Sequence, residues 1–269
     1  MHFWGTRGAV PSPSKRSVKY GGNTSCVEVR CGETVLVFDA GSGFRLLGHD
    51  LQRRKVKDFN LYFTHFHYDH ICGLPFFRPL FDTECNIRIW SGHLGGKKTT
   101  KESIREYMVY PYFPVGPEVF NANVTYHDFT AGETLSPAPD IELVTCPLNH
   151  PGGSTAYRIN FDGRSFCYVT DTEHSPGKLD ERILALIDGA DVMIYDATYA
   201  DTEYPRFVDF GHSTWEEGIR LSRAAGVKRL GIFHHRPSRT DKKLDAIGRA
   251  AKKKFANSFV TRDGQYIRL

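Results

Sequence analysis

The feature that most constrains this chain is the heptapeptide THFHYDH at residues 64–70, which holds three histidines and one aspartate. It directly follows an apolar run that predicts a short strand. His65 and His67 alternate at the end of this strand, so both imidazoles can point to one side and bind one metal ion. Asp69 and His70 follow where the chain turns toward a helix, and they can face a second ion. A lone histidine is usually a core or surface residue, but four ligand-type residues at this spacing predict a metal site.

Three further candidate ligands lie at the ends of later predicted strands. His150 follows one strand and precedes a Pro-Gly-Gly turn, Asp171 terminates the next, and His234 terminates a late one. Each residue alone has an ordinary explanation as a loop histidine or a capping aspartate. Their shared position at strand ends is what a site assembled at one edge of the sheets requires.

Strands and helices alternate along the whole chain, and a strong hairpin signal, Asp162-Gly163, joins two of the strands. The predicted strands cover residues 24–31, 33–39, 60–64, 86–90, 141–146, 156–161, 165–170, 192–196 and 228–234, with a final hairpin strand at the C-terminus. The predicted helices cover residues 44–53, 99–108, 179–187, 214–225 and 241–255. For the fourth helix, Ser213 is the predicted N-cap and Glu216 its capping-box partner. Two similar halves, roughly 1–135 and 136–269, predict one domain of the α/β class, in which two sheets carry helices on both outer faces.

Composition adds weak constraints. The net charge of +4 is compatible with a phosphate-bearing substrate but is too small to indicate a protein that tracks nucleic acid. The six cysteines are scattered without a CxxC pair, which favours free thiols over a disulfide framework. The first residues show no targeting signal and no run is long enough to span a membrane, so we expect a cytoplasmic protein.

One irregular segment stands out, at residues 107–119 (YMVYPYFPVGPEV), with three prolines and several aromatic residues. It predicts neither helix nor strand. It is either a loop packed down by its aromatics or a lid over the substrate, and the two can coincide. Tyr112 and Phe113 are its candidate substrate-binding residues.

The pattern HxHxDH, followed by a distal histidine, a strand-end aspartate and a late histidine, resembles that of the metallo-β-lactamase superfamily. The resemblance covers nearly the whole chain, from Gly5-Thr6-Arg7-Gly8 to the FHH segment at residues 233–235. It implies a four-layer αβ/βα sandwich. It also implies two divalent metal ions, for which zinc is favoured and manganese and iron are alternatives.

The resemblance assigns the ligands. His65, His67 and His150 would hold the first ion, Asp69, His70 and His234 the second, and Asp171 would bridge both. Two ions ~3.5–4 Å apart would polarise the scissile group and activate a bridging water as the nucleophile. Because only one histidine of the pair 234–235 should face the site, His234 is preferred, since it stands where the superfamily's last ligand follows its strand.

A second sequence element indicates which branch of the superfamily the chain resembles. Gly211-His212-Ser213-Thr214 resembles the GHST element of phosphodiester-cleaving members such as the tRNA 3′-processing endonucleases, where the histidine pairs with an acid after the preceding strand. Asp196 is the matching acid here, so Asp69, His212 and Asp196 are the predicted catalytic residues. The alternative is that His212 only packs against a helix start and Asp196 only ends a strand.

The long arm with which the tRNA-processing enzymes grip tRNA is not visible in the sequence. The chain also resembles phosphoribosyl cyclic phosphodiesterases and cyclic-nucleotide-degrading enzymes, through GTRG, YGGNTSC (residues 20–26), VFDAGSG (residues 37–43) and LNHPGG (residues 148–153). Arg7 is the candidate phosphate partner, or else a structural partner of Asp39. Arg236 and Arg239 are alternative phosphate partners.

These observations predict a binuclear-metal phosphodiesterase acting on a small or cyclic phosphodiester, such as a cyclic nucleotide or a cyclic ribose phosphate. The rivals are a hydrolase of the same fold acting on a lactone, lactam or thioester, an RNA endonuclease, and a non-enzymatic or redox metal protein. We expect no membrane association and no stable nucleic-acid complex. A homodimer is expected only by analogy with the family.

Overall fold

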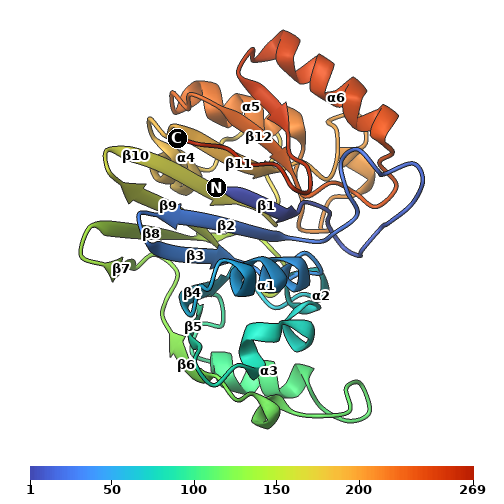
Figure 1. Cartoon of the computed structure of the whole chain (residues 1–269). Coiled ribbons are helices and arrows are strands. Elements are labelled where there is room, and N and C mark those ends of the chain that lie inside the picture. The colour runs from blue at the N-terminus through green and yellow to red at the C-terminus, as the bar shows by residue number, and fades with distance from the viewer.

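The computed structural model describes all residues 1–269 and arranges the chain as two β-sheets packed face to face (Figure 1). One sheet has six strands in the order β1-β2-β3-β4-β5-β6, and the other has seven in the order β13-β12-β11-β10-β9-β8-β7. The first sheet consists of β1 (His2–Gly5), β2 (Cys26–Cys31), β3 (Thr34–Phe38), β4 (Asp58–Phe63), β5 (Asn86–Ser91) and β6 (Asn123–Asp128). The second consists of β7 (Thr134–Ala138), β8 (Ile141–Leu148), β9 (Ser154–Phe161), β10 (Arg164–Val169), β11 (Val192–Asp196), β12 (Leu230–Phe233) and β13 (Ser258–Val260).

Helices cover the outer face of each sheet (Figure 1). They are α1 (Phe44–Arg53), α2 (Tyr68–Ile71), α3 (Thr100–Tyr107), α4 (Glu181–Ile187), α5 (Trp215–Ala224) and α6 (Asp241–Lys254). Short 3-10 turns occur at η1 (Leu74–Phe76), η2 (Arg78–Phe81), η3 (Pro117–Val119) and η4 (Tyr204–Arg206). The helices are amphipathic; α1, for example, buries Phe44, Leu47 and Leu51 at helical spacing. No helix of the structure has both the length and the apolar character needed to cross a membrane.

Three separate apolar clusters fill the spaces between the layers. One, which includes Leu47 and Leu61, lies between the first sheet and its helices. The second, which includes Phe38 and Tyr168, lies between the two sheets, and the third, which includes Ile219, lies between the second sheet and α4, α5 and α6. Each fully buried large apolar side chain contributes about 2 kcal/mol through its removal from water. Three interfaces require four layers, so the predicted αβ/βα sandwich is confirmed.

Strand direction brings the ends of several strands to one edge of the second sheet. Strand β11 pairs in parallel with both β10 and β12. Strand β9 is antiparallel to both β8 and β10, so β8 runs in the same direction as β10. The carboxyl ends of β8, β10, β11 and β12 therefore share one edge, and the loops that follow them meet there.

Several local predictions are confirmed. The Asp162-Gly163 turn joins β9 to β10, and both of its residues have positive φ, as a type I′ turn requires. All six cysteines are buried free thiols.

Two local predictions are wrong. The N-cap of α5 is Thr214, which accepts from the amide of Glu217; Ser213 instead bonds Tyr195 and His174 and is not free to cap. Strand β13 pairs with β12 in parallel and forms no hairpin with it, because α6 crosses over between them. Strands β1, β6 and β7 were not predicted; β6 and β7 lie at sheet edges, where exposed and half-buried residues alternate and no residue is fully buried.

Candidate metal centre

Three histidines form the first group of candidate ligands. His65 and His67 follow β4, and His150 follows β8. Their ligand atoms lie within 4.8 Å of one another, and His67 Nδ1 is 3.0 Å from His150 Nε2. Burial lowers the pKa of all three imidazoles, which keeps them in the neutral form that binds metals. His67 is exposed, so this group opens to solvent on its side.

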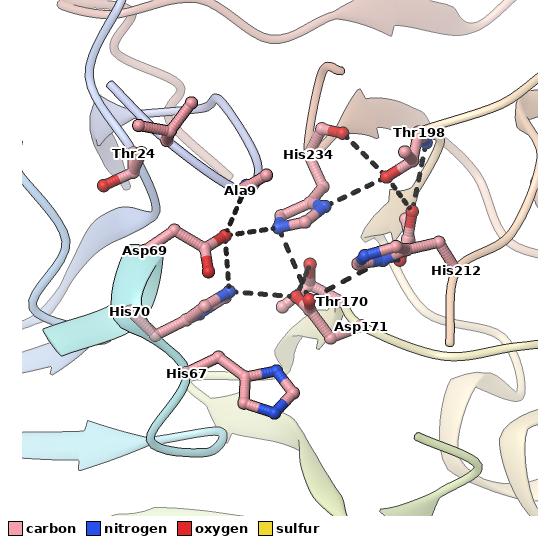
Figure 2. Close-up of polar contacts among 12 residues, drawn as sticks. Ala9, Thr24, His67, Asp69, His70, Thr170, Asp171, Thr198, His212 and His234 are labelled. Atoms are coloured by element: carbon pink, nitrogen blue, oxygen red, sulfur yellow. Dashed lines mark hydrogen bonds and ion pairs between the residues drawn. The ribbon is translucent and has the colours of Figure 1, made fainter. Parts of the chain in front are cut away.

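A second, fully buried group contains Asp69, His70, Asp171 and His234 (Figure 2). His234 Nε2 lies 3.0 Å from Asp69 Oδ2 and 3.4 Å from Asp171 Oδ1. His70 Nε2 lies 3.2 Å from Asp171 Oδ2. Asp171 Oδ1 is also 3.9 Å from His65 Nε2. Asp171 therefore stands between the two groups, in the position that a bridging ligand would take.

The second group favours a cation. Burial alone would raise the pKa of Asp171, but the facing imidazoles of His234 and His70 lower it well below its usual range. The pKa of Asp69 is also lowered well below its usual range, against its burial, by His70 and His234. In return, Asp171 and Asp69 raise the pKa of His70 well above its usual value despite its burial. Two buried carboxylates need compensating positive charge, which a divalent ion supplies.

Outer hydrogen bonds orient the buried histidines. In each of four pairs Nδ1 donates to an oxygen, which turns Nε2 toward the centre, and in the neutral imidazole Nε2 carries the lone pair that binds a metal ion. The pairs are His65 with Thr64 Oγ1 (3.0 Å), His70 with Asp39 Oδ2 (2.8 Å), His150 with the Gly211 carbonyl (2.7 Å) and His234 with Thr198 Oγ1 (3.0 Å). The Nε2 atom of His65 is buried and makes no hydrogen bond, and that of His70 faces the carboxylates of Asp171 and Asp69 at 3.2 and 3.3 Å. A buried nitrogen without a partner is costly, so His65 fits a metal ion that would use its Nε2, and His70 with the two carboxylates fits a second.

Backbone strain is concentrated at the same place. Asp39, Asp171 and His234 all have φ near +60° although none is glycine. The GTRG segment passes so close to His234 that a Cβ on Gly8 would lie 2.3 Å from its ring. This segment therefore needs glycine in order to pass His234.

His212 and Asp196 form a pair beside the second group. His212 Nδ1 lies 2.9 Å from Asp196 Oδ2 and 3.7 Å from Asp171 Oδ1. Burial opposes a charge on His212, but Asp196 and Asp171 outweigh it and raise its pKa to about 9. The His212 side chain remains 17% exposed whereas Asp196 is fully buried. Because Nδ1 is engaged by Asp196, Nε2 is the atom that can meet a substrate.

The His212 pair also has a geometry that could hold metal, since its ligand atoms lie within 4.8 Å of those of Asp171 and His234. Asp196 already accepts hydrogen bonds from His212 and Thr198. We therefore assign the pair to holding a proton, and we treat metal binding there as the alternative.

The proposed role of Arg7 in binding phosphate is wrong. Its side chain is fully buried, and its guanidinium donates to the carbonyls of Gly21 (2.8 Å) and Arg239 (2.6 Å). It is not a partner of Asp39 either, whose carboxylate is bonded by Thr64, His70 and Tyr168. Arg7 thus ties the loops around the centre together and cannot reach a substrate.

The two adjacent histidines of the FHH segment point in different directions. His234 lies in the metal cluster. His235 points away and donates from Nε2 to the carbonyl of Thr261 (2.8 Å), and burial lowers its pKa to about 3. The two later arginines also differ: Arg239 is paired with Glu203, whereas Arg236 has no carboxylate partner within ion-pair distance.

The aromatic segment 107–119 is partly packed and partly exposed. Phe113 packs against the first-sheet core and meets the edge of Phe76 at a ring distance of 5.9 Å. Tyr112 is 85% exposed. No ring contact joins either residue to the histidine cluster, so their role in binding substrate stays a prediction.

Several residues that position the ligands were not identified from the sequence. They are Thr64, Thr198, Gly8 and Glu173, together with Asp39 in its role toward His70. Most of them could have been found from the sequence, because they lie within or beside the motifs that contain the ligands. Glu173 follows Asp171 by two residues, yet its partners lie across the site in the loop before His212.

A family model described as "Beta-lactamase superfamily domain" matches residues 34–235. The chain therefore belongs to this superfamily. Membership and the arrangement of histidines and aspartates together define it as a metal-dependent hydrolase.

Particular relatives agree with this placement. The chain is similar to a ribonuclease Z of Exiguobacterium sibiricum, with 26% identity over 308 aligned residues that cover 99% of this chain and 98% of the relative. Its fold is similar to the metallo-β-lactamase fold protein YhfI of Bacillus subtilis, with a TM-score of 0.74, 17% identity and coverage of 98% and 96% of the two chains. It is also similar to the short form of human tRNase Z, with a TM-score of 0.67, 21% identity and coverage of 99% and 98%.

Proposed function

We propose that this chain is a phosphodiesterase that uses two divalent metal ions and acts on a small or cyclic phosphodiester. The observation that carries the proposal is the His212–Asp196 pair beside Asp171. Hydrolysis of a lactam or a lactone does not require an acid–imidazole pair next to the metals. Cleavage of a phosphodiester benefits from such a pair, because negative charge builds on the phosphoryl oxygens and an alkoxide must leave.

The metal ions would be held by His65, His67 and His150 on one side and by Asp69, His70 and His234 on the other, with Asp171 shared. When bound, two such ions polarise a phosphoryl group and activate water. Zinc is the favoured ion because imidazole and carboxylate ligands suit it, with manganese and iron as alternatives.

The protein's own residues supply orientation and a proton. Asp196 fixes the imidazole of His212 through Nδ1 and stabilises its protonated form. The opposite nitrogen of His212 can then donate to a non-bridging phosphoryl oxygen or to the leaving oxygen. Asp39 and Thr198 hold His70 and His234 at fixed angles, which limits rearrangement of the centre during turnover.

RNA endonuclease activity is the second candidate, because the chain aligns along nearly its full length with a relative called ribonuclease Z. The 308-position alignment is longer than the 269-residue chain, so that relative has segments without counterparts here. This difference supports a small substrate over a folded RNA.

Protein loaded separately with zinc and with manganese should be tested against a panel of substrates. We expect hydrolysis of bis(p-nitrophenyl) phosphate and of a cyclic nucleotide or a cyclic ribose phosphate, with poor cleavage of precursor tRNA. Elemental analysis of protein purified without chelator should give about two transition-metal ions per chain, the number that a two-metal site requires. Rapid lactam, lactone or thioester hydrolysis by fully metallated protein, without phosphodiesterase activity, would overturn the proposal.

A further inference from the structure

Four side chains that contact one another, and that meet His212 through Tyr199, have no role in the centre described above. They are Tyr199, which follows β11, Phe207 and Phe210 in the loop after η4, and Arg236, which lies two residues after His234. The Tyr199 ring lies 6.2 Å from the ring of His212. Because Phe210 precedes His212 by two residues, the chain itself ties this group to the rim of the centre.

The rings are stacked in a regular way. Tyr199 and Phe207 are parallel, with ring centroids 4.5 Å apart and an interplanar angle of 4°. Phe210 meets Phe207 edge to face at 5.8 Å. The guanidinium of Arg236 lies 4.5 Å from the Phe207 centroid and 5.7 Å from that of Tyr199. Contact with the rings therefore orients this cation.

Arg236 is not used by the protein's own acids. Its side chain is half-buried, and no carboxylate lies within ion-pair distance of it, in contrast to Arg239, which is paired with Glu203. A guanidinium that is oriented by rings and left without an anion can bind a phosphoryl oxygen.

The rings extend from a buried end to an exposed end. Tyr199 is only 5% exposed, Phe207 is half-buried, and Phe210 is 60% exposed. The inner pair is adequately explained as packing. Packing does not explain the outer ring, which stands in a loop beside the candidate centre.

We propose that Phe210, supported by Phe207 and Arg236, is a platform on which the base of a nucleotide substrate stacks while Arg236 contacts its phosphate. Aromatic faces together with an unpaired guanidinium match a flat base joined to an anion. The inference deepens the proposed function, on which it rests: among small phosphodiesters, it selects those that carry a base over cyclic ribose phosphates without one.

The test compares two substrates that differ only in the base, adenosine 2′,3′-cyclic phosphate and methyl riboside 2,3-cyclic phosphate, in metallated protein. Phe210→Ala should lower kcat/KM for the adenosine substrate by about tenfold or more, mainly through KM, because stacking of one base is worth that much. It should leave the methyl riboside substrate unchanged. Arg236→Gln should weaken turnover of both substrates. Tyr266→Ala, which removes an aromatic ring that is 66% exposed and pairs with His2 instead, is the matched control and should change neither.

A binding measurement separates this inference from the proposed function. Calorimetry should show that wild-type protein binds AMP about tenfold or more tightly than ribose 5-phosphate, and that Phe210→Ala removes the difference. If neither cyclic phosphate is hydrolysed but this preference is found, the platform stands and the reaction proposed above is wrong. If wild-type protein hydrolyses both substrates and Phe210→Ala affects them equally or not at all, the platform is wrong and the phosphodiesterase stands.

Discussion

The candidate metal centre and the rim around it are built in opposite ways. In the centre, every buried imidazole has one nitrogen fixed by a neighbouring oxygen, and the carboxylate of Asp171 faces several histidines at once. At the rim, Phe210 and Tyr112 are 60% and 85% exposed, and Arg236 has no anionic partner. In the centre, each ligand side chain is held in place by several contacts within the protein. At the rim, the side chains have few such contacts and are free to bind a substrate.

This difference has an energetic consequence. A substitution in the centre leaves buried charges or buried polar atoms without partners, which is costly and affects metal binding and activity together. A substitution at the rim removes only a contact with substrate, so its effect should depend on which substrate is used. The loss of activity caused by a substitution should therefore decrease from Asp171 in the centre to Tyr112 at the rim.

The largest effect is expected at Asp171, which faces both ligand groups. Asp171→Ala should lose metal and reduce turnover to background together, because its carboxylate balances the charge of both ions. Elemental analysis and turnover of bis(p-nitrophenyl) phosphate should be measured on the same preparation. Asp140→Ala, at an exposed position, serves as the control. Two ions per chain retained in Asp171→Ala would contradict the shared-ligand assignment.

His212 should show the next largest effect, and of a different kind. His212→Ala should keep its metal ions and lose turnover by roughly 10²–10⁴-fold, the usual contribution of a general acid or base. Asp196→Asn should act in the same direction, because it removes the carboxylate that orients His212 and stabilises its protonated form. Metal content and turnover are again the two readouts. If His212→Ala loses an ion, His212 is a ligand, and the group of Asp171, Asp196, His212 and His234 binds a metal ion.

Much of the centre could be predicted from the sequence because its ligands sit at fixed places in a regular fold. Strand ends are readable from apolar runs, and parallel strands bring their ends to one edge. His150, Asp171 and His234 could therefore be grouped although they are far apart in the chain. The alternation of strands and helices predicted two sheets with helices on both outer faces, and the resemblance to the metallo-β-lactamase superfamily implied the four-layer αβ/βα sandwich.

The rim could not be predicted in this way, because its contacts depend on where irregular loops fold. Arg7 looked like a phosphate partner next to a glycine motif, yet it is buried and binds carbonyls. Phe207 and Phe210 carry no motif, and only the folded loop brings them against Tyr199 and Arg236. The edge strand β6 was missed although exposed and half-buried residues alternate in it, because it has no fully buried residue and only a short apolar pattern.

Glu173 lies between centre and rim and should show an intermediate effect. Its carboxylate accepts from the amides of Asp209 (2.8 Å) and Gly211 (2.6 Å), and the Gly211 carbonyl in turn accepts from His150. Glu173→Gln should lower activity or metal affinity by roughly 10–100-fold, as is typical of groups that orient a ligand. The two N–H groups bond different carboxylate oxygens, and in glutamine one of these positions becomes an NH2 group that cannot accept.

The control for this variant is Glu181→Gln, at an exposed position at the start of α4. A positioning role predicts that the pH profile and KM of Glu173→Gln shift together with its metal affinity. A loss of thermal stability alone, with unchanged kinetics in the folded protein, would contradict that role.

The smallest effect is expected at Tyr112, which tests whether the aromatic segment 107–119 is a lid. The ring of Tyr112 is 85% exposed, while Phe113 anchors the segment to the first-sheet core. If the segment is only packed, Tyr112→Ala should change kcat/KM by no more than about twofold, in line with ordinary surface substitutions. The measurement should use the adenosine cyclic phosphate, with Phe210→Ala measured in parallel. A selective rise in KM for Tyr112→Ala, with no change for Phe210→Ala, would transfer base recognition to the aromatic segment. That outcome would also mean that the segment closes over the centre when substrate binds, because in the free protein no ring contact joins it to the histidines.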